Sequence, residues 1–151
     1  MHYSYTNLSL DELNALAVRI APQLHRSDVI TLNGTLGAGK TAFARLIIQA
    51  LVNEKIEVTS PTFSILNSYT IPQITPPLEI NHFDLYRLNT IEEAYECGIE
   101  ETLVTGINLI EWADIIAPLL TDDTIVITLT AGDHDDTRNM VLTSKNRALT
   151  L

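Results

Sequence analysis

A glycine-rich segment constrains the fold of this chain more than any other part of its sequence. Residues 34–41 read Gly-Thr-Leu-Gly-Ala-Gly-Lys-Thr and match the pattern G-x-x-x-x-G-K-[ST] at every fixed position. Residues 28–33 before it are mostly apolar and β-branched, which is typical of a buried strand. Residues 42–52 after it place apolar side chains along one face of a helix. A strand, a glycine-rich turn and a helix in this order predict an α/β unit that binds phosphate at the turn.

The residue types of this loop suit a phosphate group. Gly34, Gly37 and Gly39 accept backbone angles that a Cβ atom forbids, so successive N–H groups can turn toward an anion. The helix expected to begin near Lys40 adds unpaired N–H groups and its positive dipole end. In this motif the lysine reaches the β- and γ-phosphates and the hydroxyl of Thr41 ligates Mg²⁺. The alternative is a glycine-rich turn that binds nothing. The flanking elements favour a nucleoside triphosphate site.

The composition predicts a single folded domain over residues 1–151. With 46% hydrophobic residues, a chain of this length can bury one core. No apolar run approaches the roughly 20 residues of a membrane span, and residues 1–7 lack the features of a signal peptide. The single cysteine, Cys97, has no partner for an internal disulfide, which suits a reducing compartment. We therefore expect a cytoplasmic protein that does not use a membrane.

The charge of the chain argues against direct binding to nucleic acid. Nine basic residues stand against nineteen acidic ones, giving a net charge of −10, and no cluster of lysine or arginine stands out. Such a surface repels a phosphate backbone. If the protein serves an RNA pathway, we expect it to act through a protein partner, because an acidic surface can dock on a basic protein patch.

The remaining elements predict an α/β fold. Capping boxes at Ser9–Glu12 and Thr90–Glu93 begin two helices, the first running to about Leu24 and the second stopped by Gly98. Strands are expected at 57–59, 62–70, 78–86, 107–110, 124–130 and 139–143, with a proline-rich loop at 71–77. We predict a three-layer P-loop NTPase fold around a mainly parallel sheet, with an antiparallel insertion after the P-loop helix.

A P-loop needs an acidic residue to organise Mg²⁺ or the attacking water, and two positions qualify. Glu111 follows the expected strand 107–110, which brings it to the carboxyl edge of the sheet beside Thr41. Asp84 ends the run 80–83 and can reach the same space. Each has a simpler alternative, because Glu111 fits a solvated loop and Asp84 fits the cap of a turn.

Other residues near these acids carry more than one interpretation. Trp112, the only tryptophan, fits either the core or the wall of a nucleotide pocket. His82 is interpreted as a packed strand histidine in preference to a ligand. Ser60 and Thr62 flank Pro61 after the first crossover, where hydroxyls either sense the γ-phosphate or simply close a tight loop. The sequence shows no His/Cys cluster for zinc and no convincing Ser-His-Asp set.

Taken together, these motifs resemble the TsaE family, also called YjeE, the small ATPase of bacterial threonylcarbamoyladenosine tRNA modification. The resemblance covers nearly the whole chain, and the order and spacing of its motifs are specific. The matching segments are residues 34–41, Ser60–Phe63, His82–Arg87, Gly98-Ile99 and Glu111-Trp112. The resemblance implies ATP and Mg²⁺ as cofactors. It also implies binding to a complex of TsaD and TsaB, which transfers the threonylcarbamoyl group, so that tRNA is reached only indirectly. ATP hydrolysis would reset that complex, and hydrolysis by the isolated protein is expected to be slow.

The resemblance also implies roles for particular residues. Lys40, Asp84 and Glu111 would be catalytic, with Asp84 near the γ-phosphate, and Thr41 and Glu111 would bind the metal. Trp112 would lie beside the nucleotide, the segment Ser60–Thr62 would be a switch, and the segment Thr6–Ser9 would contact adenine. The nucleotide-binding set implied for this chain is Gly34, Leu36, Gly37, Ala38, Gly39, Lys40, Thr41, Ser60, Thr62, Trp112 and Arg138.

One loop position departs from the family pattern. Members usually carry Gly-Asp-Leu-Gly, and this chain has Thr35 in place of the aspartate. The departure removes a carboxylate close to the phosphates and leaves the loop amides in place. We expect triphosphate binding to survive, with the rate of hydrolysis or its coupling to the partner open to change.

Three rival functions are open to a chain with a P-loop. A small-molecule kinase usually needs an arginine-bearing lid, and no arginine-rich segment occurs here. A GTPase switch needs an Asn-Lys-x-Asp motif, which the sequence lacks. A nucleotide-binding regulator without catalysis is the third rival, and Thr35 is its best support.

Overall fold

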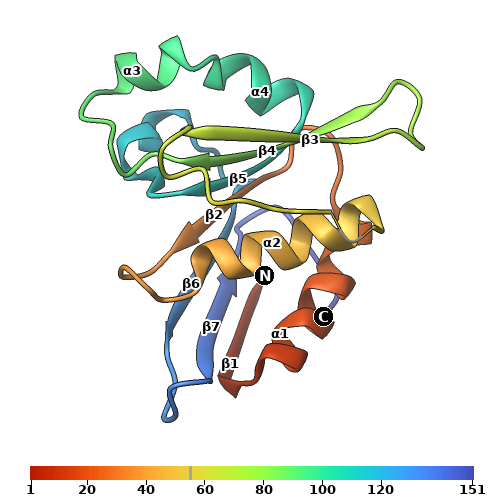
Figure 1. Cartoon of the computed structure of the whole chain (residues 1–151), viewed down its shortest axis with the longest axis vertical. Helices are drawn as coiled ribbons and strands as arrows, with labels where there is room; N and C mark the ends of the chain where they lie inside the picture. The colour runs from red at the N-terminus through yellow and green to blue at the C-terminus, as the bar shows by residue number, and fades with distance from the viewer. Residues whose placement is uncertain (55) are drawn as a thin grey trace.

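The computed structural model describes residues 1–54 and 56–151. Within these residues, the strands form one seven-stranded mixed sheet (Figure 1). The order across the sheet is β1-β7-β6-β2-β5-β4-β3. Strands β6, β2, β5 and β4 are parallel, whereas β3, β7 and β1 each pair antiparallel with a neighbour. The strands are β1 (His2–Leu8), β2 (Val29–Asn33), β3 (Leu66–Ile71), β4 (Leu78–Asp84), β5 (Ile107–Glu111), β6 (Ile125–Ala131) and β7 (Arg138–Thr143). The predicted parallel centre and the antiparallel insertion β3–β4 are confirmed.

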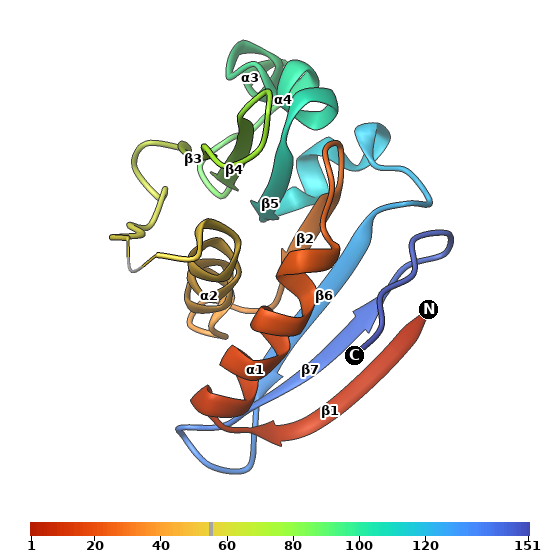
Figure 2. The same ribbon diagram turned by 90° about the vertical axis from the view of Figure 1, so that its right-hand side faces the viewer.

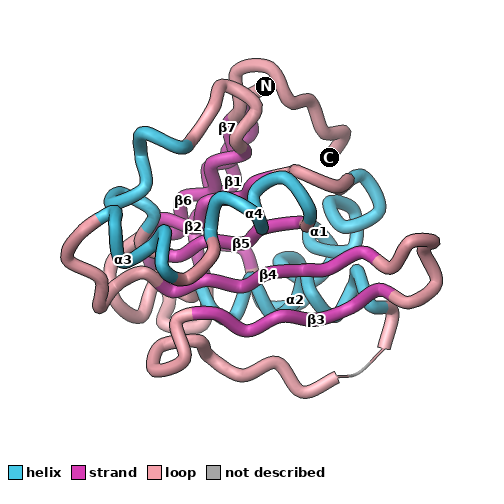
Figure 3. Tube along the Cα trace, turned by 90° about the horizontal axis from the view of Figure 1, so that it is seen from above, coloured by secondary structure: helices cyan, strands magenta, loops and turns pink. Residues whose placement is uncertain are grey.

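Helices cover both faces of the sheet and make three layers (Figures 2 and 3). One face carries α1 (Leu10–Ile20), the 3₁₀ turn η1 (Ala21–Gln23) and α2 (Lys40–Val52). The other carries α3 (Ile91–Glu96), α4 (Ile99–Thr105) and the 3₁₀ segment η2 (Ala113–Leu119). Side chains alternate between the two faces of a strand. Accordingly Leu109 of β5 joins the apolar cluster under α1 and α2, and Ile110 joins the second cluster, under α3, α4 and η2.

Both predicted capping boxes form. The Ser9 side chain accepts a hydrogen bond from the Glu12 amide, and the Glu12 carboxylate accepts one from the Ser9 amide at 2.8 Å. Thr90 and Glu93 make the same pair of bonds at the start of α3. Helix α1 ends at Ile20, before the expected Leu24, because the chain then tightens into the 3₁₀ turn η1, which contains a proline.

Some sequence expectations were wrong. Residues 57–59 form no strand, because β3 and not this segment pairs with β4, and its apolar signal reflects the burial of Val58 against α2. Strand β3 begins at Leu66 and not at residue 62, since a turn precedes it and Ile65 has a positive φ of 67°. Strand β4 ends at Asp84, two residues before the expected end at Tyr86. The elements β1, α4 and η2 were not expected from the sequence.

The topology brings three strand ends to one edge of the sheet. Strand β2 lies between β5 and β6, and the chain leaves its carboxyl end into the glycine-rich loop and α2. The parallel neighbours β5 and β4 end at the same edge, with Asp84 paired opposite Glu111. The chain adds β5 and β4 on one side of β2 and β6 on the other, so the strand order reverses at β2. In open α/β sheets, ligands bind outside the carboxyl ends of the strands, at such a reversal. Among the described helices, none has the length and apolar character needed to cross a membrane.

Candidate functional site

The glycine-rich loop has the backbone angles that its sequence predicts. Gly34, Gly37 and Gly39 have φ values of 144°, 78° and 103°, all in the region that side chains disfavour. At Gly34 a Cβ atom would lie 2.4 Å from the carbonyl oxygen of Leu129 on β6, so only glycine fits. Gly39 immediately precedes the first residue of α2, Lys40. The loop therefore turns its backbone toward the amino end of a 13-residue helix, which is the geometry of an anion site.

Lys40 is buried inside the curve of this loop, with 5% of its surface exposed. Its Nζ atom donates hydrogen bonds to the carbonyl oxygens of Gly34 at 2.8 Å and Thr35 at 2.9 Å. It also lies 4.3 Å from the ring centroid of Trp112, a cation–π distance. Burial lowers the pKa of Lys40, and the charges of Glu111 and Asp84 act in the opposite direction. The ammonium group is thus held where a phosphate oxygen can replace the loop carbonyls.

Thr41 and Glu111 form a pair that fits a metal site. The Thr41 hydroxyl donates to the Glu111 carboxylate, with Oγ1 2.7 Å from Oε1 and 3.1 Å from Oε2. Neighbouring ligands of an octahedral Mg²⁺, each at about 2.1 Å, stand about 3.0 Å apart. The described residues hold no group of three His, Cys, Asp or Glu side chains suited to a metal. A magnesium ion here would therefore complete its shell with phosphate oxygens and water, which is its usual habit.

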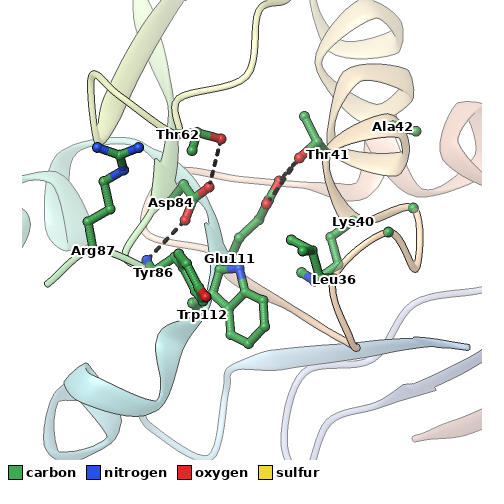
Figure 4. Close-up of a pocket in the computed structure, with 12 residues that line it drawn as sticks. Leu36, Lys40, Thr41, Ala42, Thr62, Asp84, Tyr86, Arg87, Glu111 and Trp112 are labelled. Atoms are coloured by element: carbon green, nitrogen blue, oxygen red, sulfur yellow. Dashed lines mark hydrogen bonds between the residues drawn. The ribbon is translucent and has the colours of Figure 1, made fainter.

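Asp84 caps a turn, as one of its two interpretations predicts, and it also lines the pocket that contains Lys40 and Thr41. Its Oδ1 accepts a hydrogen bond from the Tyr86 amide at 3.0 Å, which caps the turn after β4. Its Oδ2 accepts one from the Thr62 hydroxyl at 3.2 Å, and that hydroxyl lies 2.6 Å from Ser60 Oγ. Figure 4 shows Asp84 and Glu111 directed into the same pocket. A chain of hydroxyl groups thus links the segment before β3 to a buried acid.

This first pocket has a volume of about 320 Å³ and gathers most of the predicted site. Its lining is Leu36, Gly37, Gly39, Lys40, Thr41, Ala42, Thr62, Asp84, Tyr86, Arg87, Glu111 and Trp112 (Figure 4). Trp112 is half-buried in this wall and not in the core, and its φ of 56° is unusual for a residue with a side chain. Ser60 is exposed and reaches the pocket only through Thr62.

Arg138 lies away from this pocket, on the other side of the loop. Its Nε atom donates to the carbonyl oxygen of Ala38 at 3.0 Å, which braces the loop from outside. It lines a second pocket of about 290 Å³ between α1, α2 and the β6–β7 end. The lining there is Leu10, Leu13, Gly39, Ala42, Phe43, Leu46, Leu129, Asp136 and Arg138. The expected adenine-contacting segment, Thr6–Ser9, immediately precedes Leu10 in the chain.

Tyr86 and Arg87 line the pocket although the sequence did not mark them as site residues, and His82 is a packed strand histidine, as expected. Tyr86 packs on Trp112 with ring centroids 4.9 Å apart. His82 is fully buried with Nε2 3.0 Å from Oε1 of Glu111. A signal for His82 was present, because residues two apart on a strand share a face and His82 stands two before Asp84.

The fold and the loop define a protein of the P-loop NTPase class. The family described as "Threonylcarbamoyl adenosine biosynthesis protein TsaE" matches residues 8–140 of the chain. The chain belongs to the TsaE family, as its motifs predict. It therefore has a role in tRNA threonylcarbamoyladenosine biosynthesis.

Known relatives agree in sequence and in structure. The chain is 41% identical to the TsaE protein of Rickettsia conorii over 93% of this chain and 78% of the relative. It is 33% identical to the Bacillus subtilis TsaE protein over 89% of this chain and 80% of that relative. A crystal structure of YdiB from Bacillus subtilis superposes with a TM-score of 0.75 and 26% identity, covering 97% of this chain and 87% of that one.

Proposed function

We propose that the chain is a magnesium-dependent ATPase that acts on a TsaB–TsaD complex during threonylcarbamoyladenosine synthesis and does not itself transfer the group. One observation carries the proposal: a single pocket joins the P-loop residues Lys40 and Thr41 to the two strand-end acids Asp84 and Glu111. Phosphoryl chemistry needs this combination of phosphate cradle, metal ligands and a group that orients water.

The loop and Lys40 bind the triphosphate. Phosphate oxygens take the place of the Gly34 and Thr35 carbonyls as acceptors for the Lys40 ammonium, and charge-assisted bonds of this kind are about twice as strong as neutral ones. The amides at the start of α2 add further donors. The second pocket, with the apolar side chains of Leu10, Leu13 and Phe43, offers a surface for the adenine ring.

The two acids have different roles, one in holding the metal and one in orienting the attacking water. Thr41 and Glu111 hold Mg²⁺, which supplies charge neutralisation on the β- and γ-phosphates. Asp84 accepts a hydrogen bond from the attacking water and directs it at the γ-phosphate. Its Oδ1 atom also accepts the Tyr86 amide, so the turn after β4 holds the carboxylate in place whether or not Thr62 stays bound to Oδ2. In this proposal Asp84 orients the nucleophile and Glu111 orients the metal.

The same hydroxyl contacts give the protein a way to signal its nucleotide state. Thr62 bonds Asp84, and Ser60 bonds Thr62 from an exposed loop before β3. A γ-phosphate beside Asp84 competes for the Thr62 hydroxyl, so binding and hydrolysis move this loop between two arrangements. The net charge of −10 supports contact with a protein partner in preference to tRNA, which is then reached through the TsaB–TsaD complex.

One alternative has a specific observation behind it, a nucleotide-binding regulator without catalysis. Thr35 replaces the usual family aspartate, and its side chain is exposed on the loop. The loop itself does not depend on this side chain, because the Thr35 carbonyl accepts both the Ala38 amide at 3.0 Å and Lys40 Nζ at 2.9 Å. Nucleotide binding without turnover would fit that arrangement.

ATP hydrolysis measured with and without TsaB and TsaD tests the proposal. We expect slow release of phosphate by the isolated chain and a changed rate once the complex is added. The Asp84→Asn variant should release no phosphate in either condition. Tight ATP binding with no turnover in either condition would support the regulator. A burst of ADP that depends on an added metabolite would support the small-molecule kinase.

A further inference from the structure

A fully buried histidine lies behind the acid that we assign to the metal. His82 is on β4, and its Nε2 atom is 3.0 Å from Oε1 of Glu111. In the pairing of β4 with β5, His82 stands opposite Leu109, so Glu111 is its diagonal neighbour on the same face of the sheet. The contact joins two side chains that the strand register fixes, and no mobile loop takes part in it.

The hydrogen-bond network assigns the proton on this ring. A carboxylate only accepts hydrogen bonds, so the Nε2 atom of His82 must be the donor to Glu111. The other ring nitrogen, Nδ1, is buried and has no hydrogen-bond partner among the described residues. Burying an unpaired polar atom costs free energy, and an apolar residue of similar size avoids that cost. Packing alone therefore does not account for a histidine at this position.

The His82 contact becomes more important once the proposed site is in use. Glu111 has two side-chain donors among the described residues, the Thr41 hydroxyl and His82. Of these two donors, Thr41 is itself assigned to the ion, so its hydroxyl belongs to the metal shell, whereas His82 stays outside that shell. The Nε2–H group of His82 then remains to fix the rotation of the carboxylate.

We propose that His82 is a positioning residue that holds Glu111 in the orientation required for Mg²⁺, through its Nε2–H donor. The inference rests on the proposed function, because it presumes that Glu111 serves the metal of a bound nucleotide. Groups that orient a metal ligand from behind typically change metal affinity by roughly 10- to 100-fold when removed. His82 makes no contact with the nucleotide in this scheme.

The affinity of the ADP-bound protein for Mn²⁺, followed by electron paramagnetic resonance, separates this role from simple packing. His82→Leu removes the donor and keeps an apolar side chain, whereas His82→Gln keeps an N–H group at a similar reach. Asn81→Leu is the matched control, because Asn81 immediately precedes His82 on β4, is also buried and accepts a hydrogen bond from the Ser68 hydroxyl at 2.9 Å. Affinity for ADP without metal is measured for each variant.

We expect Mn²⁺ affinity to fall roughly 10- to 100-fold in His82→Leu, and to return most of the way in His82→Gln. Asn81→Leu should bind Mn²⁺ as the parent chain does, and metal-free ADP affinity should change far less in every variant. Equal losses of Mn²⁺ affinity in His82→Leu and Asn81→Leu, or no loss in either, overturn the inference about His82 and leave the proposed function standing. If the parent chain binds no ADP, the proposed function fails, and the inference fails with it.

The tautomer gives a second test that needs no variant to fold. Long-range ¹H–¹⁵N spectra of the parent chain should show the His82 ring with its hydrogen on Nε2. A ring with its hydrogen on Nδ1 cannot donate to Glu111 and overturns the inference.

Discussion

The two halves of the sheet differ in how they are covered. In the half formed by β2, β5 and β4, helices lie on both faces, and all five residues of β5 are buried. In the half formed by β6, β7 and β1, the α1 face is packed, while β1 alternates between exposed and half-buried residues along most of its length. The two acids of the first pocket both end strands of the doubly covered half. The second pocket takes Leu129 and Arg138 from the other half.

The difference in covering suits two kinds of binding surface, one that must hold a side chain in a fixed position and one that only has to offer apolar contact. A carboxylate that must meet a metal or a water within a fraction of an ångström benefits from a strand that is fixed on both faces. An apolar surface for a flat ring tolerates more freedom, because hydrophobic contact is not directional. The loop between the halves belongs to both, since Gly34 packs on the carbonyl of Leu129 while Lys40 faces the acids.

The largest expected effect is on stability and comes from a substitution in the core of the doubly covered half. Ile110→Ala should lower the free energy of unfolding by about 2–5 kcal/mol, because Ile110 is fully buried under the second apolar cluster. Val141→Ala, on the less covered face of β7, should cost about 1 kcal/mol, since Val141 is half-buried. Urea denaturation of both variants measures the difference. Similar losses would show that the two halves are equally constrained.

Removing the loop cation comes next. Lys40→Ala should weaken ATP binding by about 1.5–3 kcal/mol or more, because charge-assisted bonds to phosphate are lost. Lys145→Ala is the control: Lys145 follows β7, is exposed and pairs with Asp122 at the surface. Titration calorimetry should detect a loss only in the first variant. Near-normal affinity in Lys40→Ala would refute the P-loop assignment.

The pH dependence of ATP binding should be smaller but diagnostic. Burial lowers the pKa of Lys40 from its usual 10.5, so the ammonium loses its proton at a lower pH than an exposed lysine does. Only the charged form attracts phosphate, so affinity is full below that pKa and falls as the pH rises through it. Lys40→Arg stays charged and should lose much less affinity over the same range. A midpoint at or above 10.5 for the parent chain would contradict the burial argument.

The smallest effect is expected at the loop position that departs from the family. Thr35→Asp should raise the rate of ATP hydrolysis and leave ATP affinity nearly unchanged, because the loop is held through the Thr35 carbonyl and not its side chain. Thr35→Asn serves as the uncharged control. Phosphate-release assays that find the same rate in all three proteins would show that the departure is neutral.

Local signals in the sequence were sufficient for much of this architecture. The capping boxes at Ser9 and Thr90 form because each motif satisfies its own helix end within four residues. The glycine-rich loop follows from its own residues in the same way. Strand β1 could not be predicted as easily, because it exists through pairing with β7, for example Tyr5 with Met140, across most of the chain. Residues 57–59 show the converse, a strand-like pattern without a partner strand.

The site was predictable where a strand end defines it and not where tertiary packing does. Asp84 and Glu111 were expected in the same space because each ends a predicted strand, and the structure pairs them at the ends of the parallel neighbours β4 and β5. Arg138 was assigned to the nucleotide by resemblance, yet its place behind the loop depends on how β7 packs beside β6. The face that His82 shares with Asp84 can be predicted from their spacing, but its contact with Glu111 also depends on the register of β4 against β5, which that spacing does not specify.

The position of Trp112 has a practical consequence. The chain contains one tryptophan, and its ring lies against Lys40 at one edge of the pocket and against Tyr86 at another. All indole emission from the protein therefore originates within contact distance of the Lys40 ammonium, the group that we propose meets phosphate. Emission excited selectively at the indole is therefore an optical probe of the loop, whereas the tyrosines elsewhere in the fold are not excited. If the chain binds ATP as we propose, rapid-mixing experiments can use it to time nucleotide entry and departure without any attached dye.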